Sequence, residues 1–270
     1  MKNQITILIP TYNRAAALSV LLTSLCSQTY QDFAIIISDQ SDNNDLQQNE
    51  VLNAVLRVLR HHQHTVEIIK HLPRCGMAEQ RQFLLEQSHS PYSLFLDDDL
   101  LLEPWVVANL YKVIEQEQCG FVGSAPIGLT FSHDVRPQEE QIEFWGGKVQ
   151  PEKILPNGAK WQRYKLHNAA NLYHVARKLQ LDPLHPRPYK IAWVGACVLY
   201  NTEKLKSTGG FSFWEKLPSR HSGEDVVAQI RLMQKYGGCG IIPSGVYHQE
   251  LPTTIPDRLI NAPEYIKTNL

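Results

Sequence analysis

Three consecutive carboxylates, Asp97, Asp98 and Asp99, follow an apolar segment of strand length at residues 93–96. In extended backbone the first and third lie on the same face, about 6–7 Å apart, while Asp98 points away. Such a D-x-D pair offers the hard oxygen ligands that Mg²⁺ and Mn²⁺ prefer, and a nucleotide diphosphate could complete the coordination shell. The alternative is an acidic turn that caps a helix beginning near Pro104.

Polar residues also follow two other apolar segments. Residues 5–9 and Pro10 are followed by Thr11, Tyr12, Asn13 and Arg14, and residues 33–38 are followed by Asp39. As alternatives, Thr11 or Asn13 could cap a helix, and residues 38–42 could form only a turn. Open α/β sheets bind ligands at the carboxyl ends of their strands, so we expect these groups and the three carboxylates to converge on one crevice. There Asp39 would accept a hydrogen bond from the imide N–H of a uracil or from a ribose hydroxyl.

Two acidic residues, Glu224 and Asp225, precede an amphipathic pattern that predicts a helix over 226–236. Ser222 and Asp225 have the S-x-x-D spacing of a capping box. As a functional group, Asp225 would be a general base that removes a proton from an acceptor hydroxyl, with the helix amino terminus keeping it ionised at neutral pH. The two roles are compatible, and Glu224 is the second candidate for the base. His248 follows the last apolar segment.

The elements that must position these residues alternate between β and α. Strand-like segments at 5–9, 33–38, 65–70 and 93–96 are separated by helical patterns at 15–25, 46–60, 78–87 and 105–117. This order predicts an α/β fold with a Rossmann-like, doubly wound, mostly parallel sheet. Residues 120–190 are rich in proline and lack periodicity, which indicates loops and short elements. After residue 190 the sequence again predicts regular elements: a strand at 192–200, the helix at 226–236 and a strand near 240–242.

Composition excludes several classes of protein. The 270 residues carry 26 Lys plus Arg against 27 Asp plus Glu, a net charge of −1, so the chain has no basic field for nucleic acid. Its five cysteines are scattered, without a C-x-x-C pair, which indicates reduced thiols. No signal sequence is recognisable, and the longest apolar stretches fall short of the roughly 20 residues that cross a bilayer. We expect a cytoplasmic protein without a membrane span, and peripheral association with the inner face of the membrane stays open.

In their order and spacing these motifs resemble the inverting, nucleotide-sugar-dependent glycosyltransferases of family 2, which have the GT-A fold. The resemblance runs from Ile5 to His248 and rests on IPTYNR at 9–14, SDQSD at 38–42, Gly76 with Arg81, LDDD at 96–99, GGF at 209–211 and GED at 223–225. It implies one GT-A catalytic domain over 1–250 and a C-terminal tail over 251–270. Within the domain, residues 1–119 would bind the nucleotide-sugar, and the irregular half at 120–250 would bind the metal and the acceptor.

The resemblance also implies site residues. The base would be held by Thr11, Tyr12 and Asp39, and the rest of the nucleotide-sugar would lie near Arg14, Gly76, Arg81, Asp97 and Asp98. Mn²⁺ or Mg²⁺ would be bound by Asp97, Asp99 and His248, and catalysis would use Asp225 with Glu224 beside it. Where the family has Asn and Ala-Arg-Asn around Gly76, this chain has Arg74 and Gln80-Arg81-Gln82.

The resemblance implies a transferase of polysaccharide biosynthesis that moves one sugar per encounter, because the Q-x-x-R-W signature of processive synthases is absent. The donor would be a UDP-sugar, with dTDP-sugars not distinguished by Asp39, and the acceptor a glycan or a lipid-linked hydroxyl. A nucleotide-sugar-binding protein without activity is one alternative. A sugar nucleotidyltransferase is another, although the glycine-rich phosphate loop with a lysine is missing. Four tryptophans are candidates for stacking on an acceptor sugar: Trp145, Trp161, Trp193 and Trp214.

Overall fold

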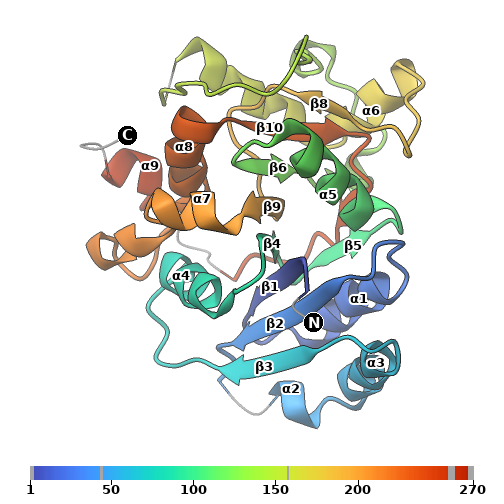
Figure 1. Ribbon diagram of the computed structural model, residues 1–270, viewed down its shortest axis with the longest axis vertical. Helices are drawn as coiled ribbons and strands as arrows, with labels where there is room; N and C mark the ends of the chain where they lie inside the picture. Colours follow the sequence, from blue (N-terminus) through green and yellow to red (C-terminus); the bar gives the residue numbers. More distant parts are fainter. Residues whose placement is uncertain (1–2, 43–44, 157, 255–258, 267–270) are drawn as a thin grey trace.

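A computed structural model describes residues 3–42, 45–156, 158–254 and 259–266 (Figure 1). Within these residues an eight-stranded sheet has the order β3-β2-β1-β4-β9-β6-β10-β8. Its strands are β1 (Ile5–Thr11), β2 (Phe33–Asp39), β3 (Val66–Lys70), β4 (Tyr92–Leu96), β6 (Phe121–Gly123), β8 (Arg187–Tyr189), β9 (Cys197–Asn201) and β10 (Gly238–Ile242). A smaller sheet, in the order β5-β11-β7, contains β5 (Leu100–Leu102), β7 (Ile127–Gly128) and β11 (Val246–His248).

The direction of the strands matches the doubly wound, mostly parallel sheet that the sequence predicts. Strands β3, β2, β1 and β4 are parallel neighbours, and β6 and β10 are parallel to each other. Strand β9 runs antiparallel between β4 and β6, and β8 is antiparallel on the far edge. The sheet is therefore continuous from the regular first half of the chain into the second half.

Helices cover both faces of the sheet. The longer ones are α1 (Ala15–Cys26), α3 (Glu50–His61), α4 (Met77–Gln87), α5 (Val106–Glu117), α6 (Asn171–Lys178) and α8 (Glu224–Tyr236). Figure 1 shows α1 and α3 on one side of the strands and α4 on the other. Side chains of β1 alternate accordingly: Ile7 packs in the core with α1 and α3, whereas Leu8 packs in the second core with α4 and α8. Shorter helices are α2 (Asp45–Gln48), α7 (Thr202–Ser207) and α9 (Ala262–Tyr265).

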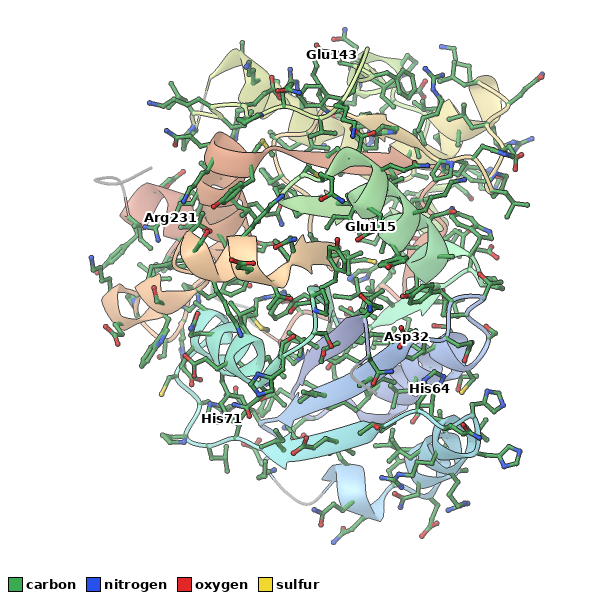
Figure 2. All side chains as sticks on the ribbon, viewed as in Figure 1. Asp32, His64, His71, Glu115, Glu143 and Arg231 are labelled. Atoms are coloured by element: carbon green, nitrogen blue, oxygen red, sulfur yellow. The ribbon has the colours of Figure 1, made fainter. Side chains whose placement is uncertain are left out.

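The carboxyl ends of the parallel strands share one edge of the sheet. Figure 2 shows His71, which follows β3, on the opposite side from Asp32 and His64, which precede β2 and β3. Since β1, β2 and β4 run parallel to β3, the polar residues after these strands lie on the same edge as His71. This edge is where the sequence places the site.

Two predicted elements differ from the structure. The helix predicted over 46–60 is divided, because Asn49 adopts extended backbone and caps α3 by accepting a hydrogen bond from the Leu52 N–H at 2.9 Å. The strand predicted over 192–200 begins only at Cys197, because Ala196 has a φ of +66° and interrupts the extended backbone.

The irregular part that the sequence predicts at 120–190 contains short strands, α6 and three segments of 3₁₀ helix: η1 (Leu129–Phe131), η2 (Pro137–Glu139) and η3 (Ala159–His167). A further 3₁₀ helix, η4 (Ser212–Lys216), follows α7. In the tail expected at 251–270, α9 packs against α8, and residues 255–258 and 267–270 lie outside the described part. Within the described part, none of the helices combines the length and the apolarity that crossing a bilayer requires.

Candidate active site

A cleft of about 550 Å³ lies at the carboxyl ends of β1 and β4 and reaches the amino end of α8. Most of the predicted site residues line it, although they come from distant parts of the chain: Thr11, Tyr12, Arg14, Arg81, Asp97, Asp98, Asp99, Glu224, Asp225 and His248. Asp39 and Gly76 are not among the lining residues.

The residues after β1 do not serve as a helix cap. The N-cap residue of α1 is Arg14, and its side chain makes no capping hydrogen bond. Thr11 instead donates its hydroxyl to Oδ2 of Asp98 at 2.7 Å, and Asn13 binds Asp42. The interpretation of Thr11 or Asn13 as a cap is therefore wrong, and Thr11 joins the ends of β1 and β4.

The three carboxylates after β4 are arranged differently from the extended D-x-D pair. Asp98 and Asp99 form a turn, so the expectation of a persisting extended backbone is wrong. Nη1 of Arg14 lies 3.2 Å from Oδ1 of Asp98 and 2.7 Å from Oδ2 of Asp99. Asp97 turns instead toward Arg81. The turn does not cap α5 either, since that helix has Trp105 as its N-cap residue without a side-chain hydrogen bond.

Burial changes the acidity of this turn. The pKa of Asp98 is raised to about 6 because the carboxyl group is buried. The hydrogen bond from Thr11 and the charge of Arg14 favour the ionised form and offset part of this effect. Asp98 is 6% exposed, so its bond to Thr11 satisfies a carboxylate that water hardly reaches.

Arg81, on α4, connects the end of β4 with the start of α8. Its Nη2 lies 2.8 Å from Oδ1 of Asp97, and its Nε lies 3.0 Å from Oε1 of Glu224. Burial alone would lower the pKa of Arg81, but the two carboxylates outweigh it and raise the pKa, so the guanidinium stays charged. Glu224 is thereby engaged in an ion pair at the base of the cleft.

Asp225 differs from its neighbour Glu224. The predicted capping box does not form, because the N-cap position belongs to Gly223, with a φ of +80° and no side chain, and Oδ1 of Asp225 accepts only from the adjacent Val226 N–H at 2.9 Å. Within the described chain, no cationic group lies within 4 Å of the Asp225 carboxylate. Burial, followed by the charge of Glu224, raises the pKa of Asp225 to about 7, against the opposing effect of Arg81. Burial and the charge of Glu224 thus oppose the expected effect of the helix end, which favours the ionised form of Asp225.

His248 comes close to Asp99 from β11. Its Nε2 lies 3.5 Å from Oδ1 of Asp99, while its Nδ1 accepts a hydrogen bond from the Glu250 N–H at 2.8 Å. This bond assigns the proton of the neutral ring to Nε2. Oδ1 of Asp99 and Nε2 of His248 are the atoms that would bind a divalent cation, which requires Nε2 to give up its proton; if the neutral ring then carries the proton on Nδ1, the hydrogen bond from the Glu250 N–H is lost. Across the described ranges no group of three or more His, Cys, Asp or Glu side chains is arranged to hold a metal, so a ligand would have to complete the coordination shell.

Asp39 and Gly76 lie behind the cleft. The Asp39 carboxylate is buried, accepts from the Ser41 N–H at 2.8 Å and lies 3.2 Å from Nζ of Lys70. Residues 38–42 do not form only a turn, because Ser38 and Asp39 belong to β2 and the chain bends after them. Gly76 is the N-cap residue of α4 with a φ of +108°. A Cβ atom there would lie 2.6 Å from the carbonyl oxygen of Ser219. Gly76 therefore lets the start of α4 approach the segment that leads to Glu224.

One wall of the cleft was predicted only at Trp193, one of the tryptophans expected to stack on an acceptor sugar. Tyr164, His167 and Asn168 line it from η3 and its end, and Trp193 and Gly195 line it from the segment before β9. Among the four tryptophans that the sequence singles out, only Trp193 lies on this cleft, as far as the structure describes the chain. The segment 159–168 has no periodic pattern, so its aromatic residues were the only available signal.

Comparison with known proteins agrees with this arrangement. A family model described as glycosyl transferase family 2 matches residues 6–177. An uncharacterised glycosyltransferase of Haemophilus influenzae is 33% identical over 150 residues, which cover 52% of this chain and 47% of that protein.

Two solved structures share the fold at low identity. TarS of S. aureus, residues 1–349 in complex with UDP-GlcNAc, has a TM-score of 0.59 and 14% identity, covering 93% of this chain and 60% of that one. The mannosyltransferase PcManGT of Pyrobaculum calidifontis, in complex with GDP-Man and Mn²⁺, has a TM-score of 0.54 and 16% identity, covering 89% and 57%. The chain thus spans about half of the curated relative and less than two thirds of these structures. The family match extends over more than half of the chain and includes the ends of β1 and β4. The chain therefore belongs to glycosyltransferase family 2, with the GT-A fold.

Proposed function

We propose that the chain is an inverting hexosyltransferase that moves one sugar from a nucleotide diphosphate sugar to a hydroxyl of a glycan or lipid-linked acceptor. The observation that carries this proposal is the position of Asp225. Its carboxylate lies in the cleft, without an ion pair in the described chain, and its pKa is near neutrality, as a general base requires. Glu224 is the less suitable general base, because its carboxylate is paired with Arg81.

The donor would occupy the half of the cleft formed by β1 and β4. We place the base near Tyr12, whose ring carries the Arg74 guanidinium 4.0 Å above its centre. Thr11 lines the cleft at this end. Asp39, its partner in the β1–β2 register, lies behind the cleft, so it would accept the imide N–H of the base only if its carboxylate releases Lys70 or the Ser41 N–H. A uridine diphosphate donor is favoured over dTDP by the UDP-GlcNAc complex of TarS.

The charge of the cleft supports a divalent cation. Five carboxylates line it against two guanidinium groups, so an anionic diphosphate would be repelled without an additional cation. Asp99 and His248 would hold Mn²⁺ or Mg²⁺, as the Mn²⁺ complex of PcManGT also suggests. When bound, the cation would neutralise the charge of the departing diphosphate. Asp97 is also expected among the metal ligands, but Arg81 holds it away from His248, so we place it with Asp98 and Arg14 near the ribose and the sugar. Arg14 holds Oδ2 of Asp99, and Oδ1 of Asp99 faces His248 and is the oxygen that would bind the cation.

In the reaction, Asp225 removes the proton of the acceptor hydroxyl as its oxygen attacks the anomeric carbon. The bond from that carbon to the diphosphate oxygen breaks in the same displacement, which inverts the configuration and needs no covalent enzyme intermediate. A positioned base of this kind contributes about 10²- to 10⁴-fold to the rate. Residues 1–250 would act as one catalytic domain, which the continuous sheet from β3 to β8 supports, with residues 1–119 binding the donor and 120–250 the acceptor.

The first test is calorimetric binding of UDP and dTDP, with and without Mn²⁺, to the wild type and to Asp99→Ala. We expect Mn²⁺-dependent binding of UDP that Asp99→Ala abolishes. Turnover of a panel of UDP-sugars, with Asp225→Asn as the comparison, then separates a transferase from a protein that only binds nucleotide-sugars. Failure of both nucleotides to bind under every condition would refute the donor site.

A further inference from the structure

The geometry points to a saccharide-binding subsite on the wall formed by Tyr164, His167 and Trp193, which takes a neutral pyranose of the acceptor. The inference rests on the proposed function for the role of this sugar as acceptor, and it adds the site and the chemical class. None of the three residues belongs to the motifs that carry the family resemblance. All three line the same cleft as Asp225.

The wall offers aromatic faces to a ligand. The rings of Tyr164 and Trp193 are within 8° of parallel, with centroids 6.1 Å apart, so they present their faces in one orientation. His167 lies edge-on to Trp193, at 82° and 6.5 Å. Both Tyr164 and Trp193 are only partly buried and border the open cleft. The apolar C–H face of a pyranose ring packs on such surfaces, because it is flat and its hydroxyl groups point outward.

The wall also offers polar atoms that the protein does not use. Nδ1 of His167 and Nε1 of Trp193 are buried and have no hydrogen-bond partner within the described part of the chain. His167 is held through its other nitrogen, which lies 2.9 Å from the Tyr189 hydroxyl. Unpaired buried polar groups are costly, and these two, among eight such atoms in the described chain, belong to residues that line the cleft, so a sugar hydroxyl that reaches them through a small rotation of the rings would relieve that cost. A sugar hydroxyl both donates and accepts, and therefore suits the indole N–H and either tautomer of the imidazole.

The wall is held at a fixed position relative to Asp225. Gln229 lies one helical turn after Asp225 on α8 and is completely buried. Its amide accepts from the Val194 N–H at 2.8 Å and donates to the Val194 carbonyl at 2.6 Å. On the other side of Val194, a Cβ atom on Gly195 would lie 3.6 Å from Oδ2 of Asp225. A pyranose packed on Trp193 therefore has its hydroxyl groups next to the proposed base.

The charges around the wall favour an uncharged sugar. Lining residues on this side carry no basic group, and Arg81, the nearest lining cation, is already bound by Asp97 and Glu224. His167 stays neutral at pH 7 because burial lowers its pKa to about 4. An acceptor with a phosphate or carboxylate at this position would face Asp225 and Glu224 without a partner. A neutral pyranose has no such penalty.

The test measures binding of three neutral probes, the methyl β-pyranosides of glucose, galactose and N-acetylglucosamine, by saturation-transfer NMR with and without UDP and Mn²⁺. Glycerol 3-phosphate is the anionic comparison. We expect at least one pyranoside to bind, with roughly tenfold weaker binding to Trp193→Ala and Tyr164→Ala. His167→Phe, which keeps the ring but removes both nitrogens, should weaken it roughly 3- to 10-fold.

Matched controls lie outside the cleft. Trp145 and His174 also carry a buried nitrogen without a partner in the described chain, but they do not line the cleft, so Trp145→Ala and His174→Phe should bind the pyranosides as the wild type does. Calorimetric binding of UDP to each variant verifies that its fold is intact. Binding that the three wall variants leave unchanged, preference for glycerol 3-phosphate, or no binding of any pyranoside to the wild type would each overturn the subsite. Pyranoside binding by a protein that fails to bind UDP would refute the donor site alone.

Discussion

Replacing Asp225 with Asn should remove most of the activity and stabilise the protein at high pH. The Asp225 carboxyl has a pKa of about 7 in the folded chain against an ordinary value of 3.8. The folded state therefore binds a proton more tightly than the unfolded state, and stability falls as the pH rises from about 4 to 7. Asn keeps an oxygen that can accept from the Val226 N–H but carries no charge to bury.

The size of the gain follows from this difference in pKa. A difference of about 3 between the folded and unfolded pKa corresponds to at most about 4 kcal/mol, at about 1.4 kcal/mol for each pKa unit. Because the Asp225 carboxylate borders an open cleft, solvent screens part of this penalty, and we expect about 1–2 kcal/mol. The gain should be present at pH 8 and close to zero at pH 4. The loss of turnover should be about 10²- to 10⁴-fold.

The assay is urea unfolding at pH 4 and pH 8, together with turnover of the best UDP-sugar. Glu224→Gln is the matched control, since it also removes one negative charge from the start of α8 but breaks the ion pair with Arg81, and should destabilise the protein. Wild-type turnover should rise with pH through the pKa of Asp225 and then level off. A destabilised Asn variant at pH 8, or one with most of its turnover intact, would refute the reasoning.

Three further variants test how the cleft is held together. Thr11→Val leaves the buried Asp98 carboxylate without its hydroxyl partner and should cost about 1–3 kcal/mol at pH 8, measured by urea unfolding. Gly76→Ala places a Cβ at a φ of +108° and 2.6 Å from a carbonyl oxygen, so it should lower the thermal midpoint by several degrees in calorimetry. Arg81→Met leaves two carboxylates without a counter-charge and should destabilise by about 3–5 kcal/mol, measured as a lower urea midpoint at an unchanged slope.

Hydrophobic periodicity alone predicted the regular first half of the fold, because each of its strands and helices carries an unbroken apolar pattern. The exceptions are local. Asn49 ends one helical pattern and caps the next within an otherwise unbroken amphipathic run, which periodicity reads as a single helix. Ala196 has a positive φ that its residue type does not reveal, since alanine rarely adopts it. Both differences come from single backbone angles, to which hydrophobic patterns are insensitive.

The site was predictable where its residues follow strands. Thr11 and Asp98 could be brought together from sequence because the ends of neighbouring parallel strands share one edge. Their hydrogen bond, like the turn at Asp99, depends on side-chain geometry that spacing does not contain. Of the wall with His167 and Trp193, the sequence singled out only Trp193, as one of four tryptophans. The rest was not predictable, because the wall is built from a 3₁₀ segment and an irregular approach to β9, and tertiary contacts alone bring its residues together.

The two arginines of the cleft explain why its residues come from so many segments. Arg14 binds both Asp98 and Asp99, and Arg81 joins Asp97 to Glu224, so these two side chains link residues that are up to 143 positions apart in the sequence. Like charges that crowd one cleft destabilise the fold unless cations offset them. The same guanidinium groups therefore stabilise the fold and line the cleft in which we propose that a nucleotide-sugar binds. Loss of activity in an arginine variant thus identifies a ligand contact only when the stability of that variant has been measured alongside it.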